Sequence, residues 1–312
     1  MKQLLNVLAR WVLAVVLAGL HSAAIAQVQV RSHGFLYANG AFTIIDVPGA
    51  SYTFANGINN TGQIVGSFEK NGVHGFIETR GTFSTIDVPG VSAPGGRRVS
   101  TVATGINDAG HIVGFFDNIN GVYGFLDADG VFSTIQPGAP FTNLGDINNT
   151  GRIVGTTSSH GFLYDNGAFT NIDFPGASFT QVSGINDVGH IVGTSQDEEY
   201  RGFVYANGTF TNIDVPGAIA TLAYGINDAG QIVGTFGDAK GGLHGFLDSD
   251  GTFSTIDFPG AFQTNPIGIN DAGQIVGSAD FLVAVPEPDS AILFSVGLLG
   301  LGLAWRYRSG VR

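Results

Sequence analysis

Short runs of apolar and β-branched residues alternate with turn-forming residues through most of the chain. The phrase GINDAGQIVG occurs twice, at Gly225–Gly234 and Gly268–Gly277. Near copies of it begin at four earlier positions: Gly57, Gly105, Asp146 and Gly184. A second phrase, typified by HGFLYANGAFTIIDVPG, begins at His33, His74, Tyr123, His160, Arg201 and His244. The pattern predicts six repeated units of about 42 residues each.

Each unit predicts four short strands. The GFLY and FTxID runs flank a polar segment that ends in glycine, as in Ala38-Asn39-Gly40, which predicts a hairpin because glycine readily adopts positive φ. The following x-Pro-Gly ends the second strand, since proline cannot continue a ladder. A third strand enters Gly-Ile, Asn-Asp-Ala-Gly turns the chain, and Gln-Ile-Val-Gly is the fourth strand. We interpret GINDAGQIVG as a strand–turn–strand unit whose Asn and Asp form the turn without a ligand. The glycine of Ile-Val-Gly indicates a close approach of two backbones.

Four antiparallel strands in every unit are typical of a propeller blade. We predict an all-β, six-bladed β-propeller over residues 27–284. The last unit ends in an extra Ile-Val-Gly strand, Gly273–Gly277, which is expected to complete the first blade and close the ring. Phe281-Leu282-Val283 and Val28–Arg31 also look like strands, so seven blades with a split seventh are the alternative. The predicted units lie near 33–73, 74–122, 123–159, 160–200, 201–243 and 244–284.

The N-terminal residues predict a secretory signal peptide over 1–26. Lys2 and Arg10 give a basic start, an apolar run follows, and Ala24-Ile25-Ala26 ends in small residues. We expect cleavage between Ala26 and Gln27, so the mature protein leaves the cytoplasm. An uncleaved membrane anchor is the alternative.

The C-terminal residues 285–312 have three parts. Val285-Pro286-Glu287-Pro288 comes first, then an apolar run over 291–305, then a basic tail containing Arg306, Arg308 and Arg312. As a helix the apolar run would be roughly 22 Å long, against ~30 Å for the hydrocarbon core of a bilayer. We expect a hydrophobic helix that holds the chain in the membrane, either transiently or permanently.

The order of these three parts resembles the PEP-CTERM sorting signal of Gram-negative bacteria. The resemblance implies recognition by an exosortase and cleavage near Pro286–Pro288. It also implies an inner-membrane intermediate, followed by delivery to the cell surface or an extracellular exopolysaccharide matrix. An ordinary C-terminal anchor is the alternative.

The repeats resemble the HAF-repeat extracellular proteins of bacteria in the phrases GFLY, IDxPG and GINDxGxIVG. This resemblance implies an exported repeat protein and little chemistry. The third unit departs from the pattern at Ile135-Gln136-Pro137 and again at Asp146, which stands where the other units have glycine. We therefore expect the third blade to differ locally.

Composition narrows the function further. The formal net charge of −12 argues against nucleic-acid partners and anionic membrane surfaces. The chain has no cysteine, which excludes cysteine nucleophiles, thiolate metal sites and iron–sulfur clusters. The GxSxG, phosphate-loop and HExxH motifs do not occur in the sequence.

Two recurring residue types could carry chemistry. The repeated His33, His74, His160 and His244 could form a ring around a propeller axis, but Tyr123 and Arg201 replace them in two units, which favours a packing or turn-capping role. The aspartate of IDxPG recurs five times and is explained by bonding to the following turn. It stands at Asp46, Asp87, Asp173, Asp214 and Asp257.

Two Asp-x-Asp-Gly segments resemble the start of a calcium loop. Their candidate ligands are Asp127, Asp129, Asp248 and Asp250. Further oxygen ligands would be needed downstream, where a strand begins instead. We interpret the segments as hairpin turns, with weak Ca²⁺ binding as the alternative, and expect no other cofactor.

Together these observations predict an exported, surface- or matrix-associated, non-catalytic repeat protein. It would bind or scaffold exopolysaccharide or surface proteins in a biofilm, and Tyr52, Phe54, Phe179 and Phe262 are candidates for stacking on sugars. A carbohydrate-active propeller enzyme, either hydrolase or lyase, is the alternative, since paired carboxylates follow no spacing rule. A purely structural or adhesive component is a third reading. The segments Val91–Val102 and Gln196–Tyr200 are candidate contact loops.

Overall fold

The computed structural model describes residues 27–90, 100–138 and 141–285. These residues form twenty-four strands and no helix, so none of them belongs to a helix that could span a bilayer. The predicted signal peptide lies outside the described residues, as does the sorting segment from Pro286 onward with Glu287, Pro288 and its arginines. Residues 31–281 form one compact unit.

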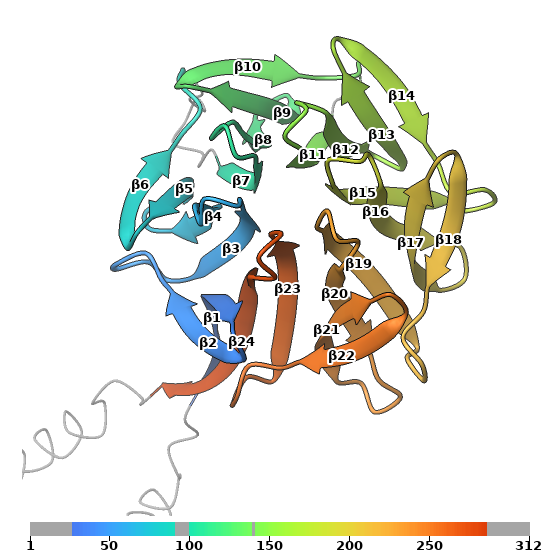
Figure 1. Ribbon diagram of the computed structural model, residues 1–312. Coiled ribbons are helices and arrows are strands. Elements are labelled where there is room, and N and C mark those ends of the chain that lie inside the picture. The colour runs from blue at the N-terminus through green and yellow to red at the C-terminus, as the bar shows by residue number, and fades with distance from the viewer. Residues whose placement is uncertain (1–26, 91–99, 139–140, 286–312) are drawn as a thin grey trace, which may run out of the picture. The chain divides into compact units, whose positions relative to one another are not determined.

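The strands form six antiparallel blades arranged around a common axis (Figure 1). Blades 1 to 5 are consecutive in the chain. Blade 1 contains β3 (Thr53–Ile58), β4 (Ile64–Glu69), β5 (Val73–Thr79) and β6 (Thr82–Ile86). Blade 2 contains β7 (Thr101–Ile106), β8 (Ile112–Asn118), β9 (Gly121–Ala128) and β10 (Val131–Ile135). Blade 3 contains β11 (Thr142–Ile147), β12 (Ile153–Thr157), β13 (His160–Asp165) and β14 (Ala168–Ile172).

The remaining blades complete the ring. Blade 4 contains β15 (Phe179–Ile185), β16 (Ile191–Gln196), β17 (Tyr200–Ala206) and β18 (Thr209–Ile213). Blade 5 contains β19 (Ala220–Ile226), β20 (Ile232–Gly237), β21 (Leu243–Ser249) and β22 (Thr252–Ile256). Blade 6 contains β23 (Gln263–Ile269), β24 (Ile275–Val285), β1 (Gln27–Ala38) and β2 (Ala41–Ile45).

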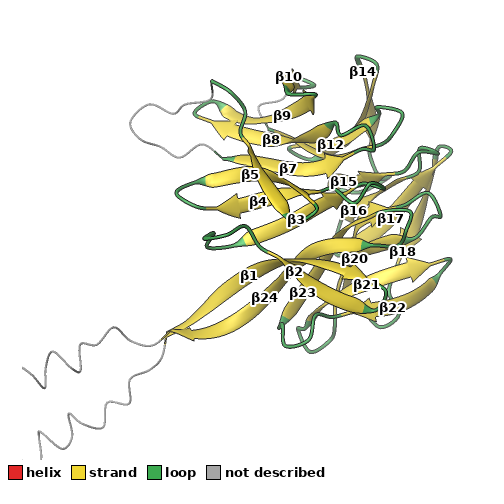
Figure 2. Ribbon diagram, turned by 60° about the vertical axis from the view of Figure 1, so that its left-hand side comes forward, coloured by secondary structure: helices red, strands yellow, loops and turns green. Residues whose placement is uncertain are grey.

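Blade 6 joins the two ends of the propeller. Its strand order is β23-β24-β1-β2, so the last Ile-Val-Gly strand pairs with the first GFLY strand (Figures 1 and 2). The predicted six-bladed fold and ring closure are therefore confirmed for the described residues. The segments that suggested a split seventh blade lie instead within β24 and β1. The first two strands of each blade come from the strand–turn–strand phrase of one predicted unit. The last two strands come from the hairpin phrase of the next unit.

The hairpins have the turns that the sequence predicts. In blade 6, Ala38 pairs with Ala41, which leaves a two-residue turn in which Asn39 and Gly40 have φ of 53° and 79°. Two consecutive positive φ values define a type I′ turn, whose twist matches that of the strands. The third blade's turn has the same form at Asn166 and Gly167.

The core consists of hydrophobic clusters between neighbouring blades. One pair of residues, a phenylalanine and a glycine, recurs in every blade. The phenylalanine of GFLY is buried in every blade, with at most 2% of its surface exposed. Its ring packs against the glycine of Ile-Val-Gly on the neighbouring strand. A Cβ at Gly234 would lie 2.9 Å from the Phe246 ring and 1.9 Å from the carbonyl oxygen of Leu222. The close backbone approach that the sequence indicates is thus present.

A buried threonine begins each inner strand and ties it to the preceding loop. In blades 1, 4, 5 and 6 its hydroxyl accepts a hydrogen bond, 2.9–3.2 Å long, from the amide of the residue before the loop proline. Blade 2 has the same bond at 3.4 Å. The preceding loop of blade 3 has only Gln136 between Ile135 and Pro137, and the hydroxyl of Thr142 has no hydrogen-bond partner among the described residues. The third blade therefore differs locally, as expected.

Candidate functional site

The innermost strands of the six blades converge on the axis, where glycine is required. A Cβ at Gly57 would lie 2.8 Å from the carbonyl oxygen of Thr104 in the next blade. At Gly225 the corresponding distance to the carbonyl oxygen of Ile267 is 2.5 Å. These glycines begin the GIN phrase, so the phrase is shaped by contact between blades as well as by its turn.

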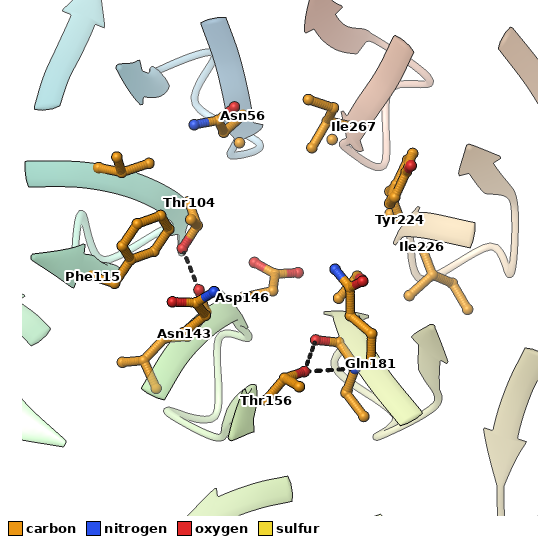
Figure 3. Close-up of a pocket in the computed structure, with 18 of the residues that line it drawn as sticks. Asn56, Thr104, Phe115, Asn143, Asp146, Thr156, Gln181, Tyr224, Ile226 and Ile267 are labelled. Carbon is orange, nitrogen blue, oxygen red and sulfur yellow. Dashed lines mark hydrogen bonds between the residues drawn. The ribbon is translucent and has the colours of Figure 1, made fainter. Parts of the chain in front are cut away.

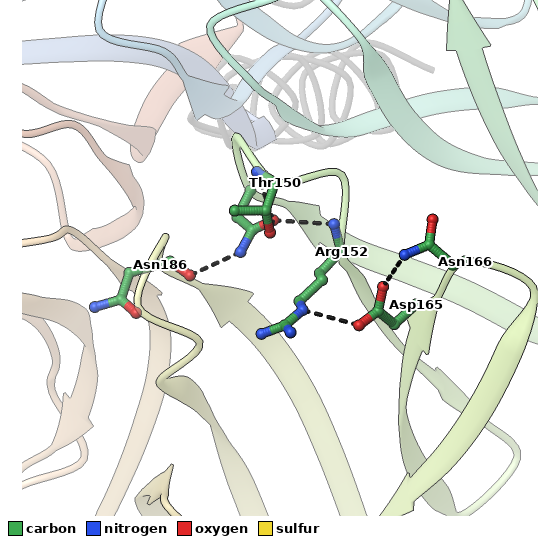
Figure 4. A network of polar contacts seen from close by, with 6 residues as sticks. Thr150, Arg152, Asp165, Asn166 and Asn186 are labelled. Atoms are coloured by element: carbon green, nitrogen blue, oxygen red, sulfur yellow. Dashed lines mark hydrogen bonds and ion pairs between the residues drawn. The ribbon is translucent and has the colours of Figure 1, made fainter.

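One end of the axis is closed by a complete ring of buried asparagines. The side-chain amide of each asparagine in the GIN phrase donates to the backbone carbonyl of the equivalent asparagine in the next blade. The six bonds run between residues 59, 107, 148, 186, 227 and 270 and back to 59, at 2.9–3.2 Å. The turn role assigned from sequence is also present, because Asn148 Oδ1 accepts from the amide of Arg152 (Figure 4).

A second, more exposed ring lies beside the first. Here the backbone amide after each asparagine donates to the side chain of the equivalent residue in the next blade, at 2.7–2.9 Å. The members are Asn60, Asp108, Asn149, Asp187, Asp228 and Asp271. The two asparagine amides bridge flanking carboxylates, but Asp228 stands between two aspartates. Desolvation raises the pKa of Asp228, and the charges of Asp187 and Asp271 raise it further.

The other side of this closed end is a cavity of about 570 Å³ along the axis (Figure 3). Its volume is within the range of small-molecule sites. Amide and hydroxyl side chains on its wall include Asn56, Thr104, Asn143, Gln181 and Tyr224. Its apolar wall includes Val102, Phe115, Val122, Phe141 and Phe179, and Phe141 is 54% exposed. The cavity therefore combines hydrogen-bonding groups with aromatic rings.

Asp146 breaks the symmetry of this cavity. The other five blades place a variable residue before the axial glycine, whereas the third blade reverses the order to Gly145-Asp146. The carboxylate consequently projects from β11 toward the middle of the cavity, between Thr104 and Gln181 (Figure 3). Its Oδ1 accepts from the amide of Ile147 at 2.8 Å and its Oδ2 from that of Ile185 at 3.3 Å.

The surroundings of Asp146 change its acidity. Burial raises the pKa of its carboxyl to about 7, against the opposing effect of the two backbone amides, and the charge of Asp187 adds to the increase. A carboxyl group with this pKa exchanges its proton near neutral pH. Among the described residues that line the cavity there is no Lys, Arg or His to hold it ionised.

The recurring histidines lie on the outer hairpins, and none lines the axial cavity. Each pairs through Nδ1 with the aspartate of IDxPG across its own hairpin: His33 with Asp46, His74 with Asp87, His160 with Asp173 and His244 with Asp257, at 2.5–3.1 Å. The sequence analysis assigned the two residues separate local roles and missed this pairing. The third unit carried a signal, because Tyr123 and Gln136 replace both partners at once.

The Asp-x-Asp-Gly segments are hairpin turns. Asp127 Oδ1 accepts from the amide of Gly130 at 2.8 Å, and Asp248 makes the same bond with Gly251. Asp129 and Asp250 adopt positive φ in these turns. Within the described parts of the chain, no group of three or more His, Asp or Glu side chains is placed to hold a metal ion.

The four aromatic candidates for sugar contact are not brought together. Phe179 lines the axial cavity, Tyr52 and Phe54 contact each other as tilted rings with centroids 4.9 Å apart, and Phe262 is exposed just before β23 of blade 6. In the acidic loop, Glu199 pairs with Arg201 at 3.3 Å. The arginines of the other candidate loop, Arg97 and Arg98, lie outside the described residues.

Comparison with protein families identifies one motif in this chain. Residues 284–309 match the PEP-CTERM protein-sorting motif. This is the segment whose three-part order suggested the same signal. Comparison with curated proteins finds none that matches the chain.

The solved structures that are similar to this chain have low sequence identity to it. The Aleuria aurantia lectin, a six-bladed β-propeller, has a TM-score of 0.44 and 13% identity, covering 73% of this chain and 94% of the lectin. AofleA from Arthrobotrys oligospora has a TM-score of 0.46 and 12% identity, covering 84% and 91%. The gluconolactonase XC5397 from Xanthomonas campestris has a TM-score of 0.41 and 14% identity, covering 74% and 86%. At these values the likenesses carry nothing about ligand or activity.

Proposed function

We propose that this chain is an exported, matrix-associated propeller that binds the end of a carbohydrate chain in its axial cavity without cleaving it. The observation that carries the proposal is the cavity itself, which one ring of asparagines closes and which amides, hydroxyls and aromatic rings line. Sugars present hydroxyl groups at their edges and C–H groups on their faces, so they need both kinds of wall. Closure at one end favours a chain end over a continuous polymer.

The export part of the proposal is supported by the sorting motif at residues 284–309. The motif favours recognition by an exosortase in a Gram-negative bacterium and release to the cell surface or the exopolysaccharide matrix. The predicted signal peptide at residues 1–26 and the resemblance to exported HAF repeats agree with this route.

Binding is favoured over catalysis by the number of carboxylates. Glycoside hydrolysis ordinarily uses two carboxyl groups on opposite sides of the scissile bond. Asp146 is the one carboxylate among the cavity-lining residues of the described part of the chain. A hydrolase reading would need a second carboxylate at this site.

The proposal is tested by titrating oligosaccharides from the producing organism's exopolysaccharide into the purified exported protein. Saturable heat with unchanged oligosaccharide length is expected. Gln181→Leu should weaken binding about tenfold because it removes an amide from the cavity wall. The fold should tolerate this change, since blade 5 has Leu222 at the same position.

The matched control is Asn212→Leu, which makes the same kind of change at an exposed site on β18. It should leave the affinity unchanged. The proposal is wrong if no oligosaccharide binds, or if Gln181→Leu and Asn212→Leu bind as wild type does. Shortened oligosaccharides would support the enzyme alternative.

A further inference from the structure

We propose that Asp146 makes the axial cavity selective for carbohydrate that carries a free, positively charged amino group. The selected ligand would be an amino sugar that is not acetylated. This inference rests on the proposed function, since it specifies which carbohydrate the same cavity binds.

The carboxylate of Asp146 stands at the position where the other five blades have glycine. Five blades have glycine at the axial position because a side chain there would collide with the next blade. Blade 3 instead directs a charged side chain into the cavity, and this side chain reaches the neighbouring blade. A Cβ at Gly105 would lie 2.5 Å from Asp146 Oδ1. A side chain at Gly105 would therefore collide with Asp146, so these two axial positions cannot both carry a carboxylate.

The second step is that the protein leaves this carboxylate only partly satisfied. It accepts two backbone amides, one of them at the long distance of 3.3 Å. A carboxylate has about four acceptor sites on its two oxygens. The cavity-lining residues that the structure describes provide no cationic partner. A ligand ammonium would supply both the missing donors and the missing charge.

The third step is the field along the axis. Asp187 raises the pKa of Asp146 through its charge, and it belongs to the ring that also holds Asp108, Asp228 and Asp271. The chain as a whole has a formal net charge of −12. This field attracts a cation toward the closed end and repels phosphate, sulfate or uronic acid groups. Neutral sugars would gain nothing from the field.

Selectivity of this kind has a pH signature. The groups facing Asp146 are Tyr224 on β19 and the ring aspartates that follow β7, β15, β19 and β23. Because the free carboxyl has a pKa of about 7, it is largely protonated at pH 6 and must release a proton to pair with an ammonium group. Amine binding should therefore release protons at pH 6 and strengthen as the pH rises toward about 7, up to the pH at which the ligand amine itself loses its proton.

The experiment uses the exported protein and one oligosaccharide preparation in two forms. Oligosaccharides from the producing organism's exopolysaccharide are titrated before and after chemical N-acetylation, which removes the charge of every free amine and keeps the backbone. Wild type is compared with Asp146→Asn, which keeps the shape of the side chain. The matched control is Asp250→Asn in the β21–β22 turn, where asparagine suits the positive φ as Asn166 does in blade 3.

Wild type should bind the untreated form at least about tenfold more tightly than the acetylated form, which corresponds to about 1.4 kcal/mol. Asp146→Asn should lose this preference and the proton release, and Asp250→Asn should keep both. Equal binding of the two forms by wild type would overturn the inference and leave the proposed function standing. A preference that persists in Asp146→Asn would overturn it too. Absence of binding to either form would remove the proposed function together with the inference.

Discussion

At the residue scale, the threonine that begins each inner strand shows how a repeated hydroxyl contributes. Thr264 is buried and accepts a hydrogen bond from the amide of Phe258 at 2.9 Å. Thr142 is equally buried, and its hydroxyl has no partner in the part of the chain that the structure describes. The same residue type at the same position therefore has a stabilising bond in one blade and a desolvated hydroxyl in another.

We expect Thr264→Val to lower the free energy of unfolding by about 1 to 3 kcal/mol, because it leaves the Phe258 amide without its acceptor. Thr142→Val should be neutral or stabilising, since it replaces a buried hydroxyl that makes no bond with a methyl group of similar size. Urea denaturation of both variants measures the difference. Equal losses in the two variants would contradict this account.

Asp146 departs from the repeat pattern at a position that lines the axial cavity. An axial glycine would remove a buried charge and restore the pattern of the other blades. Places where a sequence departs from its own structural rule are expected to be functional. The departure is visible in the sequence, but its direction toward a cavity is not, because that depends on how six inner strands converge.

At the scale of the hairpin, the paired histidine and aspartate link the two outer strands. His244 Nδ1 lies 2.8 Å from Asp257, and Nε2 lies 3.7 Å from Asp238 in the preceding loop. The hydrogen bond to Asp257 is the largest cause of the raised pKa of His244, and the charges of both aspartates add to it. The pair is partly exposed, so its effect is on titration more than on stability.

We expect NMR titration to give His244 a pKa above 6.5 in the wild type and a lower pKa in Asp257→Asn. Because the folded pKa is raised, the pair contributes stability below the unfolded pKa, and this contribution is lost as the pH rises through the folded pKa. Asp250→Asn, in the turn of the same hairpin, should leave the His244 titration in place. An unchanged titration in Asp257→Asn would contradict the assignment.

The element scale also shows what the sequence could predict. Hairpin turns such as Asn39-Gly40 follow from local φ preferences, and the close approach at Gly234 follows from the absence of a side chain. The number of blades follows from counting repeats. The buried asparagine ring could not be derived in this way, because five of its bonds join residues 38 to 48 positions apart, the sixth joins residues 211 positions apart, and the turn already explained the asparagine. The histidine–aspartate pairs needed the register of the hairpin.

At the scale of the whole molecule, the buried asparagine ring joins every blade to the next, including the last to the first. Asn270, in the C-terminal half of blade 6, donates to the carbonyl of Asn59 in blade 1 at 3.1 Å, and these two residues lie 211 positions apart in the chain. Asn227 donates to the carbonyl of Asn270 at the same distance, between two blades that are consecutive in the chain. The two asparagines have matching local partners in Gln274 and Gln231. They differ mainly in whether the contact closes the ring.

We expect Asn270→Ala and Asn227→Ala each to lower the free energy of unfolding by about 3 kcal/mol. Each change leaves a buried carbonyl and a turn amide without a partner. The two variants lose the same kinds of hydrogen bond, so we expect equal losses. Equal losses, in one cooperative denaturation transition, would mean that the junction between blades 6 and 1 is as strong as the junction between blades 5 and 6. A much smaller loss in Asn270→Ala would show that blade 6 opens before the rest of the ring unfolds.

Exposed Asp228→Asn serves as the control for the outer ring, and it should be neutral or stabilising because it removes a carboxylate held between two others.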